Sequence, residues 1–129
     1  MDPVAQLHSA QQRLFEALDL GEWSDVRRAA IHLVGLERQC VHPAAVQVGL
    51  TNDDLGPGLA RHLSWIDILS GADHPAWRQQ LRSDLIVHVA WTGSEVLPQV
   101  CRWLTNREYE ALGDRMSGLH RLGGVSRPV

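Results

Sequence analysis

The sequence predicts an all-α fold in which five to six helices form a single-domain bundle. Apolar residues recur every three or four positions along most of the chain, which is the spacing of one helix face. Capping residues and glycines divide this pattern into separate segments, as expected at helix ends. The chain has 129 residues, 44% of them hydrophobic and 21% charged, which suits one globular domain. We expect that domain to span residues 1–122, followed by a loose tail at 123–129.

The first two helices are predicted to form an antiparallel hairpin. Asp2 is a favourable N-cap, and Pro3 fits the first helical position, where a missing N–H costs nothing. Gly21 should end this helix, and a second helix is expected at about 25–41. The second helix should stop before Pro43, because a residue that precedes proline avoids helical backbone angles.

The third helix is predicted at 57–70, after a run of turn-forming residues. Residues 52–58 contain two aspartates, two glycines and a proline, which favour turns. The expected core-facing stripe of this helix is Leu59, Leu63, Ile66 and Leu69. Trp65 and Ile68 lie off that stripe, so this helix is apolar on more than one side. Such a helix is either central or carries an interface.

The fourth helix is predicted from Asp73 to about Trp91. Its core-facing residues are expected to be Trp77, Leu81, Leu85 and His88. The second half, LIVHVAW, is apolar all round and is predicted to be the most buried segment of the chain. Its β-branched residues also suit a strand, but the continuing helical period favours a helix.

Two shorter helices are expected to complete the bundle. Thr92-Gly93-Ser94 should break the chain before a helix at about 95–104. Thr105 and Glu108 have the spacing of a capping box, which predicts a final helix at about 106–121.

Composition excludes several functional classes. No apolar run approaches about 20 residues, so no membrane span is expected. The first residues lack a basic region followed by an apolar stretch, so we expect a cytoplasmic protein. All 12 basic residues are arginines, scattered along a chain of net charge −3. Nucleic-acid-binding proteins concentrate positive charge on one face, so nucleic acid is a poor candidate partner.

The cysteines and histidines do not predict a metal site or a cofactor. Cys40 and Cys101 lie in no metal or redox spacing and are expected to be buried thiols rather than a disulfide. No two of the seven histidines lie three or four residues apart on one helix. Asp84 and His88 are four residues apart, a spacing that suits an ion or a general base. We favour a structural role for this pair and expect no bound metal.

One enzymatic alternative comes from an arginine followed closely by a histidine. All-helical HEPN ribonucleases place such a pair on one helix, and Arg115 with His120 resembles that spacing. The arginine would hold the scissile phosphate and the histidine would move a proton. Because arginine and histidine are abundant in this chain, such pairs also arise by chance. A metal-independent, HEPN-like ribonuclease is therefore the alternative rather than the leading hypothesis.

The aromatic residues favour a protein partner. The chain has five tryptophans against one phenylalanine and one tyrosine. Trp23 falls at the predicted hairpin turn and Trp65 lies off its core stripe. Tryptophan and arginine are over-represented at binding hot spots. We therefore predict a partner-binding face formed by Trp65, Ile68, Arg61 and Trp23.

The opening segment also resembles a known family. Residues 6–40, with the run QQRLFEALDLGEWSDVRRAAIHLVGLERQC, are similar to the first helical hairpin of small flagellar export chaperones that bind the filament-cap protein. Proteins of that family are short and all-helical, and they often carry a Gly-acid-Trp turn like Gly21-Glu22-Trp23. The resemblance implies a helical protein that binds a partner.

Together these features predict a small cytosolic protein that recognises another protein as a chaperone, adaptor or inhibitor. The mechanism would be an apolar helical face, rimmed by charged residues, into which a partner segment docks. A homodimer would use the same kind of face. Besides the ribonuclease, a phage-encoded inhibitor or toxin-neutralising protein is a further alternative with the same binding chemistry.

Overall fold

The computed structural model describes the backbone of residues 1–125 and the side chains of residues 1–120, and it confirms the all-α bundle. Within residues 1–125 there is no strand. The α-helices are α1 (Pro3–Leu20), α2 (Trp23–Leu36), α3 (His42–Gln47), α4 (Asn52–Leu69), α5 (Pro75–Trp91), α6 (Leu97–Trp103) and α7 (Asn106–Val125). Two π-helical turns, η1 (Glu37–Val41) and η2 (Thr92–Val96), join α2 to α3 and α5 to α6.

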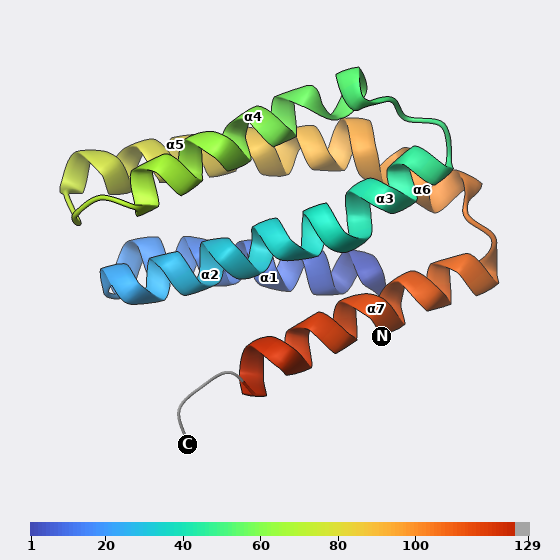
Figure 1. The fold of residues 1–129 in the computed structure, drawn as a ribbon, viewed down its shortest axis with the longest axis horizontal. Helices are drawn as coiled ribbons and strands as arrows, with labels where there is room; N and C mark the ends of the chain where they lie inside the picture. Colours follow the sequence, from blue (N-terminus) through green and yellow to red (C-terminus); the bar gives the residue numbers. More distant parts are fainter. Residues whose placement is uncertain (126–129) are drawn as a thin grey trace.

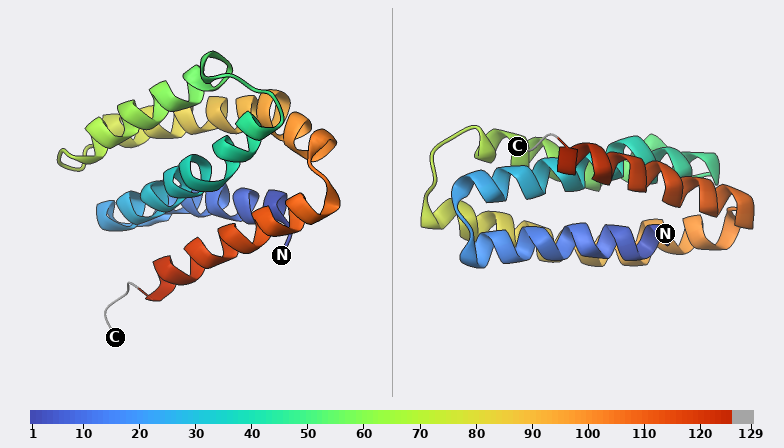
Figure 2. Two further views of the ribbon diagram at one scale, coloured as in Figure 1. Left: turned by 45° about the vertical axis from the view of Figure 1, so that its right-hand side comes forward. Right: turned by 90° about the horizontal axis from the view of Figure 1, so that it is seen from below.

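The helices are arranged in two layers. Figure 1 shows α4, the α2–α3 rod and α7 side by side in the front layer, with α5 and α1 behind them. The view from below in Figure 2 separates this layer from the second, which α1 and the α5–α6 rod form. Each layer buries the inward face of its helices against the other, which is how a helical bundle makes one core.

Local signals in the sequence correctly place several helix ends. The Asp2 carboxylate accepts a hydrogen bond from the Ala5 N–H, and Pro3 occupies the first turn of α1. Thr105 and Glu108 form the predicted capping box at the start of α7, with hydrogen bonds of 2.9 and 3.1 Å. The final helix continues to Val125, so its predicted end at about residue 121 is wrong. Residues 126–129 of the expected tail lie outside the described residues.

The two predicted chain breaks near residues 42 and 92 are wrong, because a π-helical turn carries the helix through each of them. In η1 the His42 N–H bonds to the Glu37 carbonyl, five residues back, and in η2 the Leu97 N–H bonds to the Thr92 carbonyl. Each turn is followed, one residue later, by a proline of the next helix. Proline has no N–H and its ring presses on the carbonyl four residues earlier. The wider π-helical turn relieves that conflict, so the rod continues.

Helix α4 begins earlier than predicted and turns a different face to the core. A capping box between Thr51 and Asp54 starts the helix at Asn52, and Pro57 lies inside it. The buried stripe is Leu55, Gly58, His62, Trp65 and Leu69. Leu63 and Ile66, which were predicted to be core, are 63% and 51% exposed. The prediction failed because the true stripe contains a glycine and a histidine, which carry little hydrophobic signal.

Helix α5 is also less buried than its sequence suggests. Leu81, Leu85 and His88 face the core, but Trp77 at the start of the helix is half exposed. Within LIVHVAW, Ile86 and Val87 are 55% and 56% exposed, so this segment is not buried all round. It is helical throughout, which excludes the strand alternative.

The two cysteines differ in their exposure. Cys40 is buried as expected, whereas Cys101 is exposed, and both are free thiols. No helix in the described part of the chain is both long enough and apolar enough to cross a membrane.

A close approach of α4 to α5 depends on Gly58. A Cβ atom at this position would lie 2.5 Å from the Trp91 ring and 3.4 Å from the His88 ring. We expect Gly58→Ala to lower the free energy of unfolding by about 1–3 kcal/mol, as overpacking of a core does. Urea denaturation of both proteins measures this difference.

Gly35 provides the control for Gly58. It lies inside α2, and the nearest atom that a Cβ there would meet is Nε2 of the flexible Gln39 side chain at 3.9 Å. Gly35→Ala should therefore keep or raise stability, by up to about 1 kcal/mol from helix propensity. Equal effects of the two substitutions would show that the Gly58–Trp91 approach does not limit packing.

Candidate functional site

A buried carboxylate lies between two buried histidines where three helices meet. Glu37 is the first residue of η1, His62 lies on α4 and His88 lies on α5. All three side chains are 0% exposed. Charged residues are rarely buried to this degree unless they are paired, so this cluster needs a physical explanation.

The hydrogen bonds of the cluster fix the position of each proton. The Glu37 carboxylate accepts from His62 Nε2 at 2.6 Å and from His88 Nε2 at 2.7 and 2.9 Å. Arg38 Nε donates to His62 Nδ1 at 3.3 Å, and Arg61 Nε donates to His88 Nδ1 at 2.9 Å. Because arginine is always a donor, each Nδ1 must accept and each Nε2 must carry the proton. Two chains of the form Arg→His→Glu therefore converge on one carboxylate.

This network keeps Glu37 ionised inside the core. Burial raises the pKa of Glu37, but the hydrogen bonds from His62 and His88 outweigh burial and hold the pKa at about 2. At the neighbouring His42, burial is the dominant effect. It lowers the pKa of this histidine to about 4, so His42 is neutral. Burial also lowers the pKa of Arg61. The stable arrangement is a negative Glu37, neutral histidines and two positive arginines at the rim.

The cluster has the composition of a metal site but not the surroundings of one. One ligand atom from each of Glu37, His62 and His88 falls within 4.8 Å of the others, and a carboxylate with two imidazoles suits several transition metals. A metal would need the lone pair of each Nε2, which would move the proton to Nδ1. The proton on Nδ1 would then point at an arginine N–H, which is another donor. A metal-bound histidine instead needs an acceptor for its second ring N–H. A divalent cation would also add positive charge beside two arginines, so the residues do not fit a metal.

Aromatic rings surround the network and leave a few polar atoms unpaired. Trp65 packs edge-on against His88 with ring centres 5.0 Å apart, and Arg61 lies over the Trp91 ring at 5.1 Å. His42 stacks on His62 at 5.5 Å. Among the described residues, the indole N–H of Trp65, one terminal guanidinium nitrogen of Arg61 and Nδ1 of His42 have no partner. The rings shield the hydrogen bonds of Glu37 from water, which strengthens them.

Sequence reasoning missed this cluster, although a signal was present. The predicted partner of His88 was Asp84, but Asp84 instead accepts a hydrogen bond from Gln80. The residues of the cluster come from three helices, so no local spacing reveals them. Glu37, however, lies four residues after the buried Leu33, on the inward stripe of its helix. A charged residue at an inward position predicts a buried partner.

The structure corrects the predicted partner-binding face. Trp65 and Trp23 are 1% and 8% exposed, so neither is an exposed anchor. The Trp23 indole N–H donates to the Gly71 carbonyl at 3.0 Å and helps to close the bundle. Arg61 is half-buried in the Glu37 cluster, and Ile68 is half-buried against the core. These four residues do not form one accessible surface.

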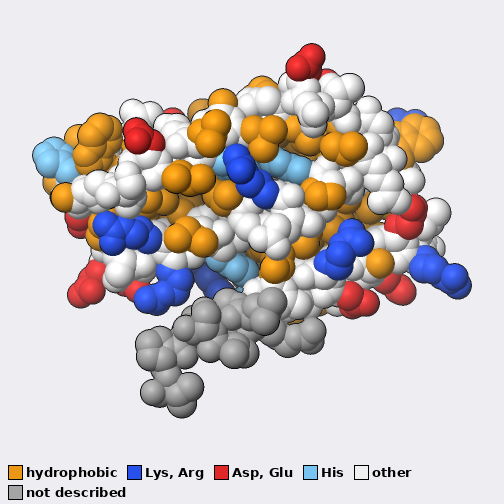
Figure 3. Space-filling view, viewed as in Figure 1, with side chains coloured by type: hydrophobic (Ala, Val, Ile, Leu, Met, Phe, Trp, Pro, Cys, Tyr) orange, Lys and Arg blue, Asp and Glu red, His pale blue; other side chains and the backbone are white. Residues whose placement is uncertain are grey.

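A different apolar surface lies between α2 and α4. Its exposed aliphatic residues are Ile31, Leu63 and Ile66, and we call it the α2–α4 strip. On α2, Ile31 follows Arg27 by one turn, and the Arg27 side chain reaches α4 by donating to the Leu69 carbonyl at 2.8 Å. In the space-filling view of Figure 3, apolar side chains gather over α4 and α2 on this face.

On α4, the other half of the strip lies beside the Glu37 cluster. Arg61 and Trp65 turn towards α5, where they meet His88. His62 turns towards Glu37. Ile66 follows His62 by one turn, on the side away from Arg61, so it lies on the flank of α4 that is turned away from α5. The buried cluster therefore holds the two halves of the strip together.

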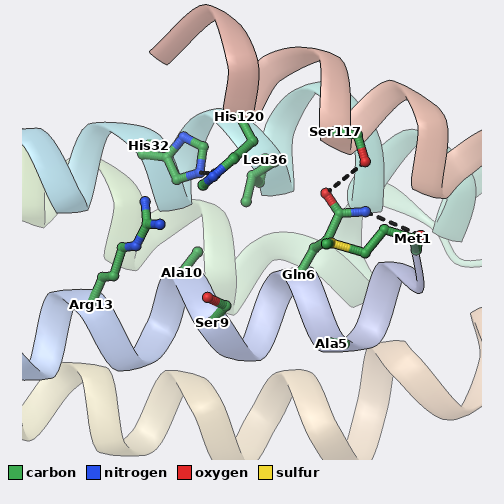
Figure 4. A pocket seen from close by; sticks show the side chains of 10 residues that line it. All are labelled: Met1, Ala5, Gln6, Ser9, Ala10, Arg13, His32, Leu36, Ser117 and His120. Carbon is green, nitrogen blue, oxygen red and sulfur yellow. Dashed lines mark hydrogen bonds between the residues drawn. The ribbon is translucent and has the colours of Figure 1, made fainter. Parts of the chain in front are cut away.

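A pocket of about 570 Å³ opens on the other side of α2, between α1 and α7. Figure 4 shows Arg13, His32 and His120 at one end of it, with Ala10 and Leu36 beside them. His120 Nδ1 lies 3.5 Å from His32 Nε2. Arg115, the predicted catalytic partner of His120, is exposed and is not among the residues that line this pocket. Five residues along a helix correspond to about 140° of rotation, which separates the two side chains.

The Glu37 cluster should be a large source of stability. Glu37→Gln removes the charge but keeps the shape, and it replaces one of the two acceptor oxygens with an NH2 donor beside two histidine N–H groups. We expect a loss of about 1–3 kcal/mol in the free energy of unfolding, as when buried donors lose a charged acceptor. Thermal and urea denaturation measure it. Glu16→Gln on the exposed side of α1 is the control and should change stability little. A similar small effect of Glu37→Gln would contradict the assigned hydrogen bonds to a charged Glu37.

The assignment of the cluster as metal-free makes a separate prediction. Neither EDTA nor a modest excess of Zn²⁺ should change the melting temperature, because a ligand stabilises only the state that binds it. Differential scanning calorimetry with and without each additive tests this. A rise in melting temperature with Zn²⁺ that disappears in Glu37→Gln would instead identify a metal centre.

Comparisons with known proteins add no assignment. No family model, no curated protein and no solved structure matches the chain. The resemblance of residues 6–40 to flagellar export chaperones therefore stays a prediction, and any function must be argued from the residues of this chain.

Proposed function

We propose that the chain is a small partner-binding protein that docks an acidic amphipathic helix of another protein on the α2–α4 strip. The observation that carries this proposal is the exposure of three aliphatic side chains on the neighbouring helices α2 and α4. Ile31, Leu63 and Ile66 are 66%, 63% and 51% exposed. Exposed aliphatic residues that share a surface mark interaction sites more often than isolated ones do.

The charges beside the strip favour an acidic partner. Arg27 donates to the backbone carbonyls of Leu69 and Gly71, and Arg38 donates to His62. Among the described residues, neither guanidinium is within ion-pair distance of a carboxylate; the arginine–carboxylate pairs there involve Arg28, Arg78 and Arg82. The Arg27 charge, which has only carbonyl partners, is therefore left to attract a partner, and complementary charge speeds association and selects the partner.

The shape of the strip favours a helix as the docked segment. A groove between two helices accepts a third helix whose apolar residues recur at three- and four-residue spacing. The Glu37–His62 hydrogen bond joins the α2–α3 rod to α4, so the strip is held in place before a partner binds. A preformed surface loses less conformational freedom on binding. Chaperone, adaptor and inhibitor roles all use this kind of recognition.

No observation favours the ribonuclease alternative in its predicted form. It needs Arg115 and His120 at one phosphate, and only His120 lines the pocket between α1 and α7. The partner-binding proposal uses neither residue.

Two synthetic helical peptides test the proposal directly. Both carry the same leucine stripe, flanked by glutamate in one and by lysine in the other. We expect the glutamate peptide to bind with a Kd of about 10–100 µM and the lysine peptide at least about tenfold more weakly. Fluorescence anisotropy of the labelled peptides gives both values.

Paired variants locate the binding surface. Replacing both Leu63 and Ile66 with serine should weaken binding of the glutamate peptide by about tenfold or more, because apolar contact area is lost. The same change at Ile86 and Val87, which are similarly exposed on α5, should have little effect. Equal binding of the two peptides, or loss of binding only with the α5 pair, would overturn the proposal. A dimer that dissociates in the Leu63/Ile66 variant would assign the strip to a second copy of the chain instead.

A further inference from the structure

The pocket between α1, α2 and α7 gathers positive charge at one end. Arg13 comes from α1, His32 from α2 and His120 from α7. The two histidine rings meet edge to face with centres 5.4 Å apart. None of the described residues that line the pocket is an aspartate or glutamate. Three helices thus place potential cations together without an anion of the protein between them.

The other polar end of the pocket is already satisfied within the protein. The Gln6 side chain donates to the Gly113 carbonyl at 3.0 Å and accepts from the Ser117 hydroxyl at 3.2 Å. Between these two ends Ala10 and Leu36 form an apolar part of the wall, with the Ser9 hydroxyl beside it (Figure 4). The three basic side chains of the pocket lie together at the Arg13 end, away from the hydrogen bonds of Gln6.

We propose that this pocket binds a small amphiphilic anion. A carboxylate or phosphate head would accept hydrogen bonds from Arg13, His32 and His120, and a short apolar body would lie against Ala10 and Leu36. The volume of about 570 Å³ is within the range of small-molecule sites. This inference is independent of the α2–α4 strip, which lies on the other flank of α2.

Binding of an anion should be coupled to proton uptake. Burial lowers the pKa of His32, and the nearby His120 and Arg13 lower it further. An anionic head would counter the charges of both neighbours and raise the pKa of His32 again. The protonated site should therefore bind more tightly, and affinity should rise as the pH falls from about 7.5 to about 5.5.

Octanoate is the probe for this site, and isothermal titration calorimetry measures its binding. 1-Octanol supplies the same apolar chain without the charge, and inorganic phosphate supplies an anionic head without the chain. We expect saturable octanoate binding in the micromolar to low millimolar range, with both controls at least about tenfold weaker. Octanoate affinity should also increase towards pH 5.5.

Matched variants assign the binding to the pocket. Arg13→Gln and His32→Gln should each weaken octanoate binding by about tenfold, because charge-assisted hydrogen bonds are lost. Arg28→Gln and His8→Gln replace the same residue types on the same two helices away from the pocket and should leave binding unchanged. Circular dichroism checks that each variant is folded.

Three results would overturn the proposal. The first is the absence of saturable octanoate binding up to about 10 mM. The second is octanol binding as tightly as octanoate. The third is octanoate binding that Arg13→Gln and His32→Gln leave unchanged in folded protein.

Discussion

The packing of the helices depends on one buried carboxylate. Glu37 accepts hydrogen bonds from two histidines that lie on different helices. Helix α4 meets the rest of the bundle at this point, through His62 to η1 and through Arg61 to α5. An ionised carboxylate in the core is costly unless its oxygens are hydrogen-bonded. The two imidazoles supply these hydrogen bonds, and each of them accepts a hydrogen bond from an arginine at the rim. Alternative packings of α4 would leave Glu37 without the His62 donor, so the cluster favours one arrangement of the helices.

Helix α2 has different neighbours on three of its sides. Its inward face carries the apolar core and leads to Glu37, one flank carries Ile31 towards α4, and the other carries His32 towards α7. Adjacent residues of α2 therefore take part in two proposed binding surfaces that face different neighbours. Because one rigid helix supports both, the position of each surface depends on the same buried carboxylate.

Much of the fold could be predicted from local sequence signals. The cap at Asp2, the capping box at Thr105 and the helical period of most segments determine where several helices lie. The helix breaks were mispredicted because proline and glycine were expected to stop a helix that a π-helical turn instead continues. The core face of α4 was mispredicted because apolar periodicity does not detect His62 or Gly58, whose burial depends on residues of other helices.

The candidate sites were harder to predict for a related physical reason. Glu37, His62 and His88 become neighbours only after three helices pack, so no spacing along the chain links them. His120 was identified, but with Arg115 on its own helix rather than with Arg13 and His32 across the bundle. The exposed aliphatic residues of the α2–α4 strip look like core residues in the sequence. Only the packing of α4 shows that they face outwards.

The two π-helical turns constrain how the chain can change in length. Such a turn is equivalent to one residue inserted into an α-helix. Deletion of one residue from η1 would restore regular pairing but would press the Pro43 ring against a backbone carbonyl. Replacement of Pro43 alone would leave the extra residue in the helix, although no proline ring would then require the wider turn. Loss of the insertion and loss of the proline are therefore compatible only as a pair, and the same coupling applies at η2 and Pro98.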